Sequence, residues 1–170
     1  MMWLGAESLR SERLEYRRFT DADRASIRAI VSDGSVTEPA GYAPISSDAE
    51  FEKFFTALRE DGCAVVQGGE VIGYFRVFEE EAEGEYAGKS CVGVGFVLDA
   101  RHHGSGYGTE MLRFLTARLK RQFDLCFADA FTDNPASNRV ITKCGYRYTE
   151  DYCMYFDGLG REMTCRSYVF

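Results

Sequence analysis

The chain has 170 residues, of which 45% are hydrophobic and 14% aromatic, and it contains only 3 prolines. This composition excludes a disordered or collagen-like chain and predicts a single folded domain spanning residues 1–170. The formal net charge is −7, which is the wrong sign for neutralising a phosphate backbone. We therefore expect no nucleic-acid partner.

The N-terminus and the cysteines indicate the compartment. The first seven residues lack a basic segment followed by a long apolar one, and no later stretch has the apolar length of a membrane span. Six cysteines occur singly, without a Cys-x-x-Cys pair, which favours reduced thiols in the core. We expect a cytoplasmic protein with no membrane partner.

The first part of the chain predicts a strand, a helix and a loop. Alternating residues at 14–17 indicate a strand. Thr20 and Asp23 form a capping box that begins a helix, and Gly34 ends it. Residues 35–45 contain two prolines and little periodicity, which predicts a loop long enough to form the wall of a cleft.

The middle of the chain predicts a second helix and three strands. A second capping box opens a helix over residues 47–61, whose phenylalanines recur at helical spacing and are expected in the core. Apolar runs at 63–67 and 71–78, joined by two glycines, predict a hairpin. Residues 79–85 carry five carboxylates, which indicates a solvated loop or, alternatively, an electrostatic funnel for a cationic substrate. Residues 90–98 predict a strand buried on both faces.

Three glycines lie between that strand and the next helix, at positions 104, 106 and 108. A helix N-terminus has unpaired amides and the positive end of the helix dipole, and glycines remove the side chains that would hold a diphosphate away. The pattern predicts an anion site, although a tight turn alone would also explain it. It is neither a P-loop nor a dinucleotide-binding fold, because the Gly-Lys-Ser/Thr sequence and the repeated βαβ units are missing.

A further strand and short helix follow. Residues 125–131 form an apolar run that predicts a strand. Asn134 is placed to cap the helix, Pro135 occupies its first position and Gly145 ends it.

Together these two segments resemble the GNAT superfamily of N-acetyltransferases. The resemblance rests on Arg101-x-x-Gly104-x-Gly106-x-Gly108 after a buried strand and on Asn134-x-x-Ser137-x-x-Val140-x-x-Lys143-x-Gly145-Tyr146 further along. The opening segment with its Thr20/Asp23 box and the terminal hairpin through Asp157-Gly158 resemble the RimJ/RimL-type branch more narrowly. The resemblance covers the chain from about residue 12 to its end.

The resemblance implies an α/β (α+β) fold of GNAT type. The expected sheet is twisted, mixed and mostly antiparallel, with about six or seven strands and about four helices. Its central parallel strands are expected to splay apart and admit acetyl-CoA.

The resemblance also implies that acetyl-CoA binds as a co-substrate. The strand backbone would bind the pantetheine arm, the amides of residues 104–109 would bind the pyrophosphate, and Arg101 would contact phosphate unless it forms an exposed ion pair. Asn134 would bind the cofactor arm, with N-capping as its alternative role. The predicted cofactor-binding residues are Phe96, Val97, Leu98, Arg101, Gly104, Ser105, Gly106, Tyr107, Gly108, Thr109 and Asn134.

Ser137 is the predicted catalytic residue. Acetyl transfer needs a neutral amine, a donor for the oxyanion and a proton for the departing thiolate. A backbone N–H of residues 96–98 is the expected oxyanion donor. Many superfamily members have a tyrosine acid seven residues after the asparagine, but this position is Ile141 here. The RimJ/RimL-type branch has a serine three residues after it, as this chain has at Ser137, whose alternative role is to complete the helix cap.

The general base is left open by the sequence. The glutamate that this branch often carries before the glycine turn falls at Gly93. His102 and His103 are the only histidines and are candidate bases by residue type, but they lie beside the turn, where packing or phosphate contact is expected. Glu38, or a glutamate within 79–85 acting through water, are the other candidates, and an amine that arrives neutral would need no strong base.

Two functions remain from the sequence. The first is an acetyl-CoA-dependent N-acetyltransferase that acts on a primary amine, either a protein N-terminus or a small cationic amine, by direct transfer in a ternary complex. The second is a catalytically silent acyl-CoA-binding module, suggested by Gly93 and Ile141. We favour the enzyme because Ser137 is present and the acidic charge suits a cationic acceptor.

The aromatic residues of the C-terminal segment leave the oligomeric state open. They are expected to complete the core, with a dimer patch as the alternative, so the protein is a monomer or a homodimer. These residues are Tyr152, Tyr155, Phe156, Tyr168 and Phe170. Two adjacent histidines without further ligands do not form a metal site, so no metal is expected.

Overall fold

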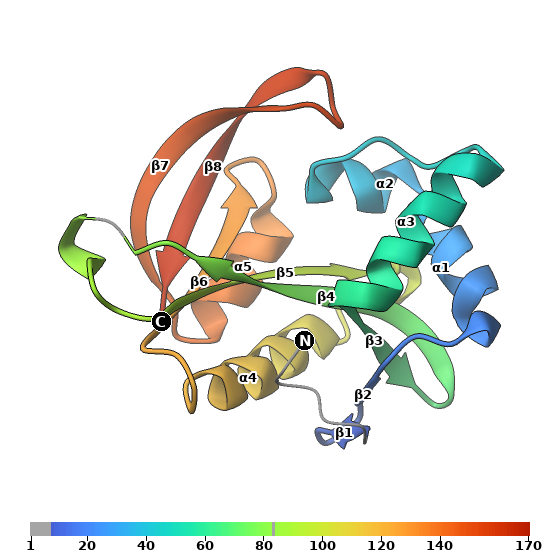
Figure 1. Cartoon of the computed structure of the whole chain (residues 1–170), viewed down its shortest axis with the longest axis horizontal. Coiled ribbons are helices and arrows are strands. Elements are labelled where there is room, and N and C mark those ends of the chain that lie inside the picture. The colour runs from blue at the N-terminus through green and yellow to red at the C-terminus, as the bar shows by residue number, and fades with distance from the viewer. Residues whose placement is uncertain (1–7, 83) are drawn as a thin grey trace.

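The computed structural model describes residues 8–82 and 84–170, so the N-terminal segment considered above lies outside the described residues. One eight-stranded sheet runs through the molecule in the order β1-β2-β3-β4-β5-β6-β8-β7 (Figure 1). Its strands are β1 (Leu9–Arg10), β2 (Glu15–Arg17), β3 (Gly62–Gln67), β4 (Glu70–Glu80), β5 (Cys91–Leu98), β6 (Leu125–Phe131), β7 (Arg147–Phe156) and β8 (Arg161–Val169).

Helices cover both faces of this sheet. They are α1 (Arg24–Val31), α2 (Gly34–Thr37), α3 (Asp48–Asp61), α4 (Tyr107–Leu119) and α5 (Pro135–Lys143). One core cluster joins one face of the sheet to α4 and α5 through residues such as Phe75, Leu115 and Ile141. The other core cluster joins the opposite face to α1, α2 and α3, and includes Phe55 and Leu58. Burying such a side chain contributes about 1.5 to 3 kcal/mol, so these clusters hold the helices on the sheet.

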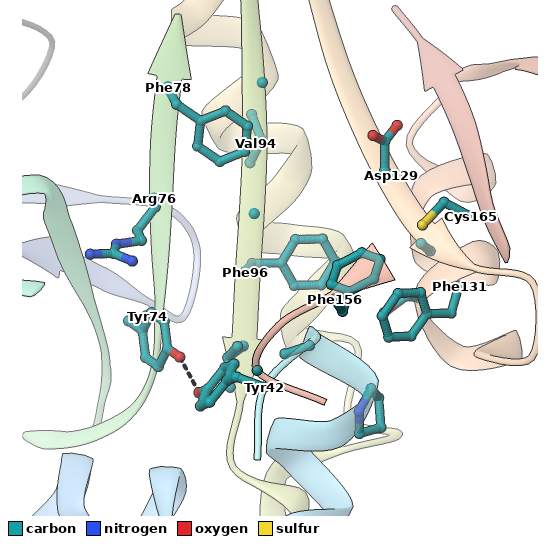
Figure 2. Close-up of a pocket in the computed structure, with 18 of the residues that line it drawn as sticks. Tyr42, Tyr74, Arg76, Phe78, Val94, Phe96, Asp129, Phe131, Phe156 and Cys165 are labelled. Atoms are coloured by element: carbon teal, nitrogen blue, oxygen red, sulfur yellow. Dashed lines mark hydrogen bonds between the residues drawn. The ribbon is translucent and has the colours of Figure 1, made fainter. Parts of the chain in front are cut away.

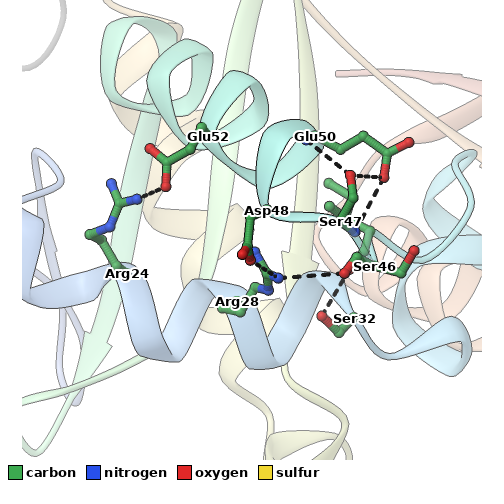
Figure 3. A network of polar contacts seen from close by, with 9 residues as sticks. Arg24, Arg28, Ser32, Ser46, Ser47, Asp48, Glu50 and Glu52 are labelled. Atoms are coloured by element: carbon green, nitrogen blue, oxygen red, sulfur yellow. Dashed lines mark hydrogen bonds and ion pairs between the residues drawn. The ribbon is translucent and has the colours of Figure 1, made fainter.

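Polar contacts between α1 and α3 supplement this packing (Figure 3). Arg28 pairs with Asp48 at 2.6 Å, and Arg24 pairs with Glu52. Exposed ion pairs of this kind contribute less than about 1 kcal/mol each. They orient the two helices, while the apolar cluster beneath them supplies the stability.

Both predicted capping boxes are confirmed. The N–H of Glu50 donates to Ser47 Oγ at 3.2 Å at the start of α3. The N–H of Thr20 donates to the Asp23 carboxylate at 2.7 Å. The Thr20/Asp23 box opens a short 3-10 helix, η1 (Asp21–Asp23), which leads into α1.

The predicted numbers of strands and helices were too low. The sheet has eight strands and the described residues contain five α-helices, against the expected six or seven and about four. The segment 35–45, predicted as a loop, holds most of α2 and the 3-10 helix η2 (Glu38–Ala40). Gly34 was wrongly expected to end the first helix, because α1 ends at Val31 and Gly34 begins α2. A two-residue strand and a four-residue helix are too short to produce a periodic pattern.

The acidic run was also assigned partly wrongly. Glu79 and Glu80 belong to β4, which pairs with β5 as far as Glu80 opposite Cys91. Glu81 and Ala82 follow the end of the strand. Strand pairing therefore fixes the backbone of the first two glutamates of this run.

The central strands β5 and β6 separate as expected. They are parallel and pair only from Cys91 opposite Leu125 to Gly93 opposite Phe127. Beyond Gly93, β5 pairs only with β4, whereas β6 pairs with β8. The edge of β5 that faces β6 therefore has no strand partner along residues 94–98.

Most of the cysteines lie in the core as free thiols. All six cysteines are free, and five are buried, whereas Cys153 is exposed. No helix among the described residues is long and apolar enough to cross a membrane.

Candidate active site

Two cavities lie where β5 and β6 diverge. The larger one, of about 870 Å³, is called the cleft cavity here and lies between the sheet, α3 and the β7–β8 hairpin. The smaller one, of about 420 Å³, is called the glycine-turn cavity and lies between the end of β5 and the N-termini of α4 and α5. They share the wall residues Pro39, Ala40, Phe96, Val97 and Ser137. The cavities therefore meet at the splayed end of the central strands.

The N-terminus of α4 opens into the glycine-turn cavity. Gly106 is the N-cap residue and has a φ of 81°, a left-handed conformation that favours glycine. No side chain caps this helix, in contrast to α3 and α5, so the amides of its first turn have no protein acceptor supplied by a cap. These amides and the positive end of the helix dipole form a site suited to a phosphate group.

The turn is supported from the N-terminal segment. The Arg13 guanidinium donates to the Glu110 carboxylate at 2.7 Å and to the carbonyl of Ser105 at 3.0 Å. It also lies over the Tyr107 ring, 4.6 Å from the ring centre. Gly108 allows close packing behind the turn, because a Cβ atom there would lie 3.4 Å from Val140. These contacts hold the backbone of the turn in place.

Most predicted cofactor-binding residues line the glycine-turn cavity. They are Phe96, Val97, Leu98, Gly104, Gly106, Tyr107, Gly108, Thr109 and Asn134. Ser105 and Arg101 are not among the residues lining it. Arg101 is 66% exposed at its side chain and pairs with Asp99 at 2.6 Å and Glu70 at 3.0 Å, which is the alternative considered from the sequence.

Ser137 and Asn134 form a cap at the start of α5. The Ser137 N–H donates to Asn134 Oδ1 at 3.1 Å, and Asn134 Nδ2 donates to Ser137 Oγ at 3.1 Å. The Ser137 hydroxyl oxygen therefore accepts a hydrogen bond, while its own proton has no acceptor among the described residues. Ser137 lines both cavities, so this residue lies at the junction between them.

Aromatic side chains line much of the cleft cavity, and Asp129 lies on its β6 side (Figure 2). The other charged residues that line it are Glu50, Lys53, Arg76 and Glu80. Tyr42 and Tyr74 share a hydrogen bond of 2.5 Å, and burial raises the pKa of both hydroxyls. The Phe131 and Phe156 rings meet edge to face, with centres 4.9 Å apart. Asp129 points into the space between the strands and accepts a hydrogen bond from Tyr152.

The β7–β8 hairpin closes this cavity on one side. The Ala43 N–H donates to the Gly158 carbonyl at 2.8 Å, so the tip of the hairpin touches the segment that follows η2 (Figure 1). A Cβ atom on Gly41 would lie 3.0 Å from the Phe156 ring. Segments more than a hundred residues apart thus form one wall.

A family model described as an acetyltransferase (GNAT) domain matches residues 13–147, which is most of the chain. The chain belongs to the GNAT acetyltransferase family. This membership confirms the predicted N-acetyltransferase with acetyl-CoA as its acetyl donor. No curated protein sequence matches this acetyltransferase significantly.

Solved structures share the fold at low sequence identity. A GNAT-family acetyltransferase from Bacillus anthracis has a TM-score of 0.79 and 19% identity, over 96% of this chain and 98% of that one. Spermidine N-acetyltransferase from Vibrio cholerae, determined with CoA and spermine, has a TM-score of 0.74 and 14% identity, over 94% and 96%. Ribosomal-protein-alanine N-acetyltransferase from Brucella melitensis has a TM-score of 0.67 and 16% identity, over 91% and 98%. These similarities confirm the GNAT fold.

The candidate bases of this GNAT acetyltransferase lie in different places. His102 and His103 line the glycine-turn cavity, and a ring nitrogen of His103 lies 2.9 Å from the Leu98 carbonyl oxygen. Glu38 is exposed and does not line either cavity. Glu80 lines the cleft cavity, on the same side as Gly93. No group of three or more potential metal ligands occurs among the described residues.

Sequence reasoning missed the contribution of the C-terminal aromatic residues to this acetyltransferase. Of those expected in the core, Tyr168 is buried, whereas Tyr155 and Phe170 are exposed. Tyr152 and Phe156 line the cleft cavity. The period-2 alternation of β7 contained a weak signal, because both residues lie on the same face of that strand.

Proposed function

We propose that this acetyltransferase transfers the acetyl group of acetyl-CoA directly to a primary amine within one ternary complex. The observation that carries the proposal is the meeting of two cavities at Phe96, Val97 and Ser137. Two substrates can bind on opposite sides of this junction at once, and direct transfer requires such proximity.

The glycine-turn cavity is suited to acetyl-CoA. The amides at the uncapped start of α4 would bind the pyrophosphate, next to Gly104 and Gly106, which carry no side chains. The unpaired edge of β5 would bind the amide groups of the pantetheine arm, as a peptide adds to a strand edge. Acetyl-CoA supplies the activated thioester that the reaction consumes.

Residues at the junction would stabilise the reacting groups. A backbone N–H on the unpaired edge of β5 would donate to the oxyanion that forms on the carbonyl oxygen. The Ser137 hydroxyl, held by Asn134 and with its proton free, would donate that proton to the departing thiolate.

The cleft cavity favours a cationic acceptor. Its aromatic side chains can contact the apolar part of an amine. Three carboxylates, Glu50, Glu80 and Asp129, line it against two cations, Lys53 and Arg76, and Arg76 is paired with Asp61. A small polyamine and a protein N-terminus both present a primary ammonium group, and the Vibrio cholerae and Brucella melitensis enzymes are named for one acceptor of each kind. We place the chain with the RimJ/RimL-type branch because Ser137 stands three residues after Asn134.

Replacing Ser137 with alanine is expected to lower kcat by about 10- to 100-fold, because one hydrogen bond to a developing charge contributes about 1.5 to 3 kcal/mol. The Kd for acetyl-CoA, measured by calorimetry, should change little. Thr142→Ala is the matched control, because Thr142 lies on the same helix and its hydroxyl donates to helix carbonyls such as that of Asn138. Unchanged kcat in Ser137→Ala would remove Ser137 from the mechanism.

The proposed function is tested by thiol release from acetyl-CoA. Purified protein is assayed with spermidine, aminoglycosides, amino acids and N-terminal peptides, and acetyl-CoA binding is measured by calorimetry. Release that depends on one class of amine supports the proposal and identifies the acceptor class. Tight binding of acetyl-CoA without release in the whole panel would instead support a silent acyl-CoA-binding module.

A further inference from the structure

We infer that Glu80 of β4, reaching across the bare backbone of Gly93 on β5, is the group that accepts the proton of the acceptor amine. The inference rests on the proposed function and adds the base that acetyl transfer to an ammonium group requires. Its basis is the local geometry of three adjacent strands, β4, β5 and β6.

Gly93 leaves space that side chains of β4 occupy. In the β4–β5 ladder, Phe78 is opposite Gly93 and Glu80 is opposite Cys91. A Cβ atom on Gly93 would lie 2.3 Å from the Phe78 ring and 2.6 Å from Glu80 Oε1. The Glu80 carboxylate therefore lies over the backbone of Gly93 itself, at the last residue of β5 that pairs with β6. Any side chain at position 93 would displace it.

This position exposes the carboxylate to the cleft cavity. Glu80, Gly93 and Asp129 all line that cavity, together with the Phe78 ring. Glu80 has no hydrogen-bond or ion-pair partner among the described residues. Asp129, in contrast, accepts a hydrogen bond of 2.7 Å from the Tyr152 hydroxyl. Of the two carboxylates, Glu80 is the one that is free to take up a proton.

The surrounding groups make Glu80 more basic than an ordinary carboxylate. Partial burial, and then the negative charge of Asp129, raise the pKa of Glu80. The titratable groups around it are Cys91 on β5, Asp129 on β6 and Tyr152, which bonds to Asp129 from β7. Arg76, the cation of its own strand, pairs with Asp61 at 2.8 Å. A carboxylate with a raised pKa is better matched to proton transfer near neutral pH.

The proton balance of the reaction gives Glu80 a defined role. The acceptor ammonium loses one proton to Glu80, and the neutral nitrogen forms a bond to the carbonyl carbon of the thioester. The C–S bond breaks, the sulfur leaves with the bonding electron pair, and the thiolate takes up one proton. The proton of the thiolate comes from Ser137, and Ser137 regains a proton from the nitrogen as the amide forms. The net product is one proton, which Glu80 can release to water because it is exposed.

The decisive variant is Glu80→Gln, which keeps the size of the side chain and removes its basicity. We expect a loss in kcat of about 100-fold with spermidine, or with the fastest amine of the panel, because a positioned base contributes about 10²- to 10⁴-fold. The loss should be much smaller with hydroxylamine, which is uncharged at neutral pH. The Kd for acetyl-CoA should not change. Glu79→Gln is the matched control, because Glu79 is the adjacent exposed carboxylate and does not line the cleft cavity.

Two further variants test the geometry. Gly93→Ala leaves Glu80 in the chain but displaces its carboxylate, so it should lower kcat as well, with folding checked by thermal unfolding. Asp129→Asn removes the charge that raises the pKa of Glu80. Since Glu80 must be deprotonated to act, the acidic limb of the pH–rate profile should move to lower pH in Asp129→Asn.

The outcomes separate this inference from the proposed function. A wild-type protein that releases no thiol with any amine would overturn the proposed function and the inference with it. An active wild-type protein combined with a fully active, folded Glu80→Gln variant would overturn only the inference. An equal loss of rate with spermidine and hydroxylamine would also overturn it, because the role of Glu80 would then be structural.

Discussion

Replacing Gly106 with valine is expected to weaken acetyl-CoA binding by about 100-fold, which corresponds to about 2.7 kcal/mol. Gly106 has a φ of 81°, where a branched side chain is strained, and it caps the helix whose amides face the glycine-turn cavity. A Cβ atom there would also lie 3.4 Å from the Arg13 guanidinium that braces the turn. Calorimetric titration with acetyl-CoA measures the effect.

Gly88→Val is the matched control for this prediction. Gly88 has nearly the same backbone conformation, with a φ of 82°, and a Cβ atom there would meet nothing within 4 Å. It lines neither cavity, so the variant carries the strain of the substitution without touching the site. If Gly106→Val bound acetyl-CoA as tightly as Gly88→Val, the assignment of the pyrophosphate to this turn would be wrong.

Replacing Asp23 with asparagine is expected to lower the free energy of unfolding by about 3 kcal/mol at pH 7. Asp23 is only 5% exposed, and its carboxylate accepts two hydrogen bonds from Arg17, at 2.7 and 2.8 Å, and one from the Thr20 N–H. Asparagine would leave the guanidinium without its counter-charge. For a chain of this length, thermal unfolding should begin about 6 to 12 °C lower.

The loss of unfolding free energy in Asp23→Asn is expected to depend on pH. Burial alone would raise the pKa of Asp23, but hydrogen bonds from Arg17 and Thr20 outweigh it and hold the pKa below its usual value. The stabilisation is therefore complete above the unfolded-state pKa and is lost as the pH falls through the lower folded-state pKa. The difference between the wild-type protein and Asp23→Asn should be largest at neutral pH and shrink below about pH 4.

Asp21→Asn serves as the control for this substitution. Asp21 pairs with Arg59 at 2.7 Å, but its side chain is 75% exposed. Such a pair contributes less than about 1 kcal/mol, so the variant should unfold nearly as the wild-type protein does. Equal destabilisation by the two substitutions would show that burial of the Arg17–Asp23 pair does not matter.

The parts of the site that could be predicted depend on residues close together in the chain. The glycine turn needs only a strand, three glycines and a helix start in succession, and the structure places all three glycines at one cavity. The capping pair Asn134 and Ser137 is likewise three residues apart and forms as expected. Their assigned roles in binding and catalysis remain predictions.

The parts that could not be predicted join distant segments. Asp23 was expected to cap a helix, but its strongest contacts come from Arg17 on β2. Ala43 meets Gly158 across the cleft, and Asp129 meets Tyr152. Each contact depends on which strands are neighbours and in what register, and residue spacing along the chain carries no such information.

Gly93 shows most clearly what the amino-acid sequence decides and what only the tertiary structure decides. The amino-acid sequence by itself determined the family resemblance, the capped helices and the glycine turn before α4, because short-range spacing and backbone preference specify them. It also showed that position 93 lacks a carboxylate. Only the tertiary structure decided that Glu80, thirteen positions earlier, lies over that glycine, because an antiparallel ladder brings the two residues together and the missing side chain leaves the space open.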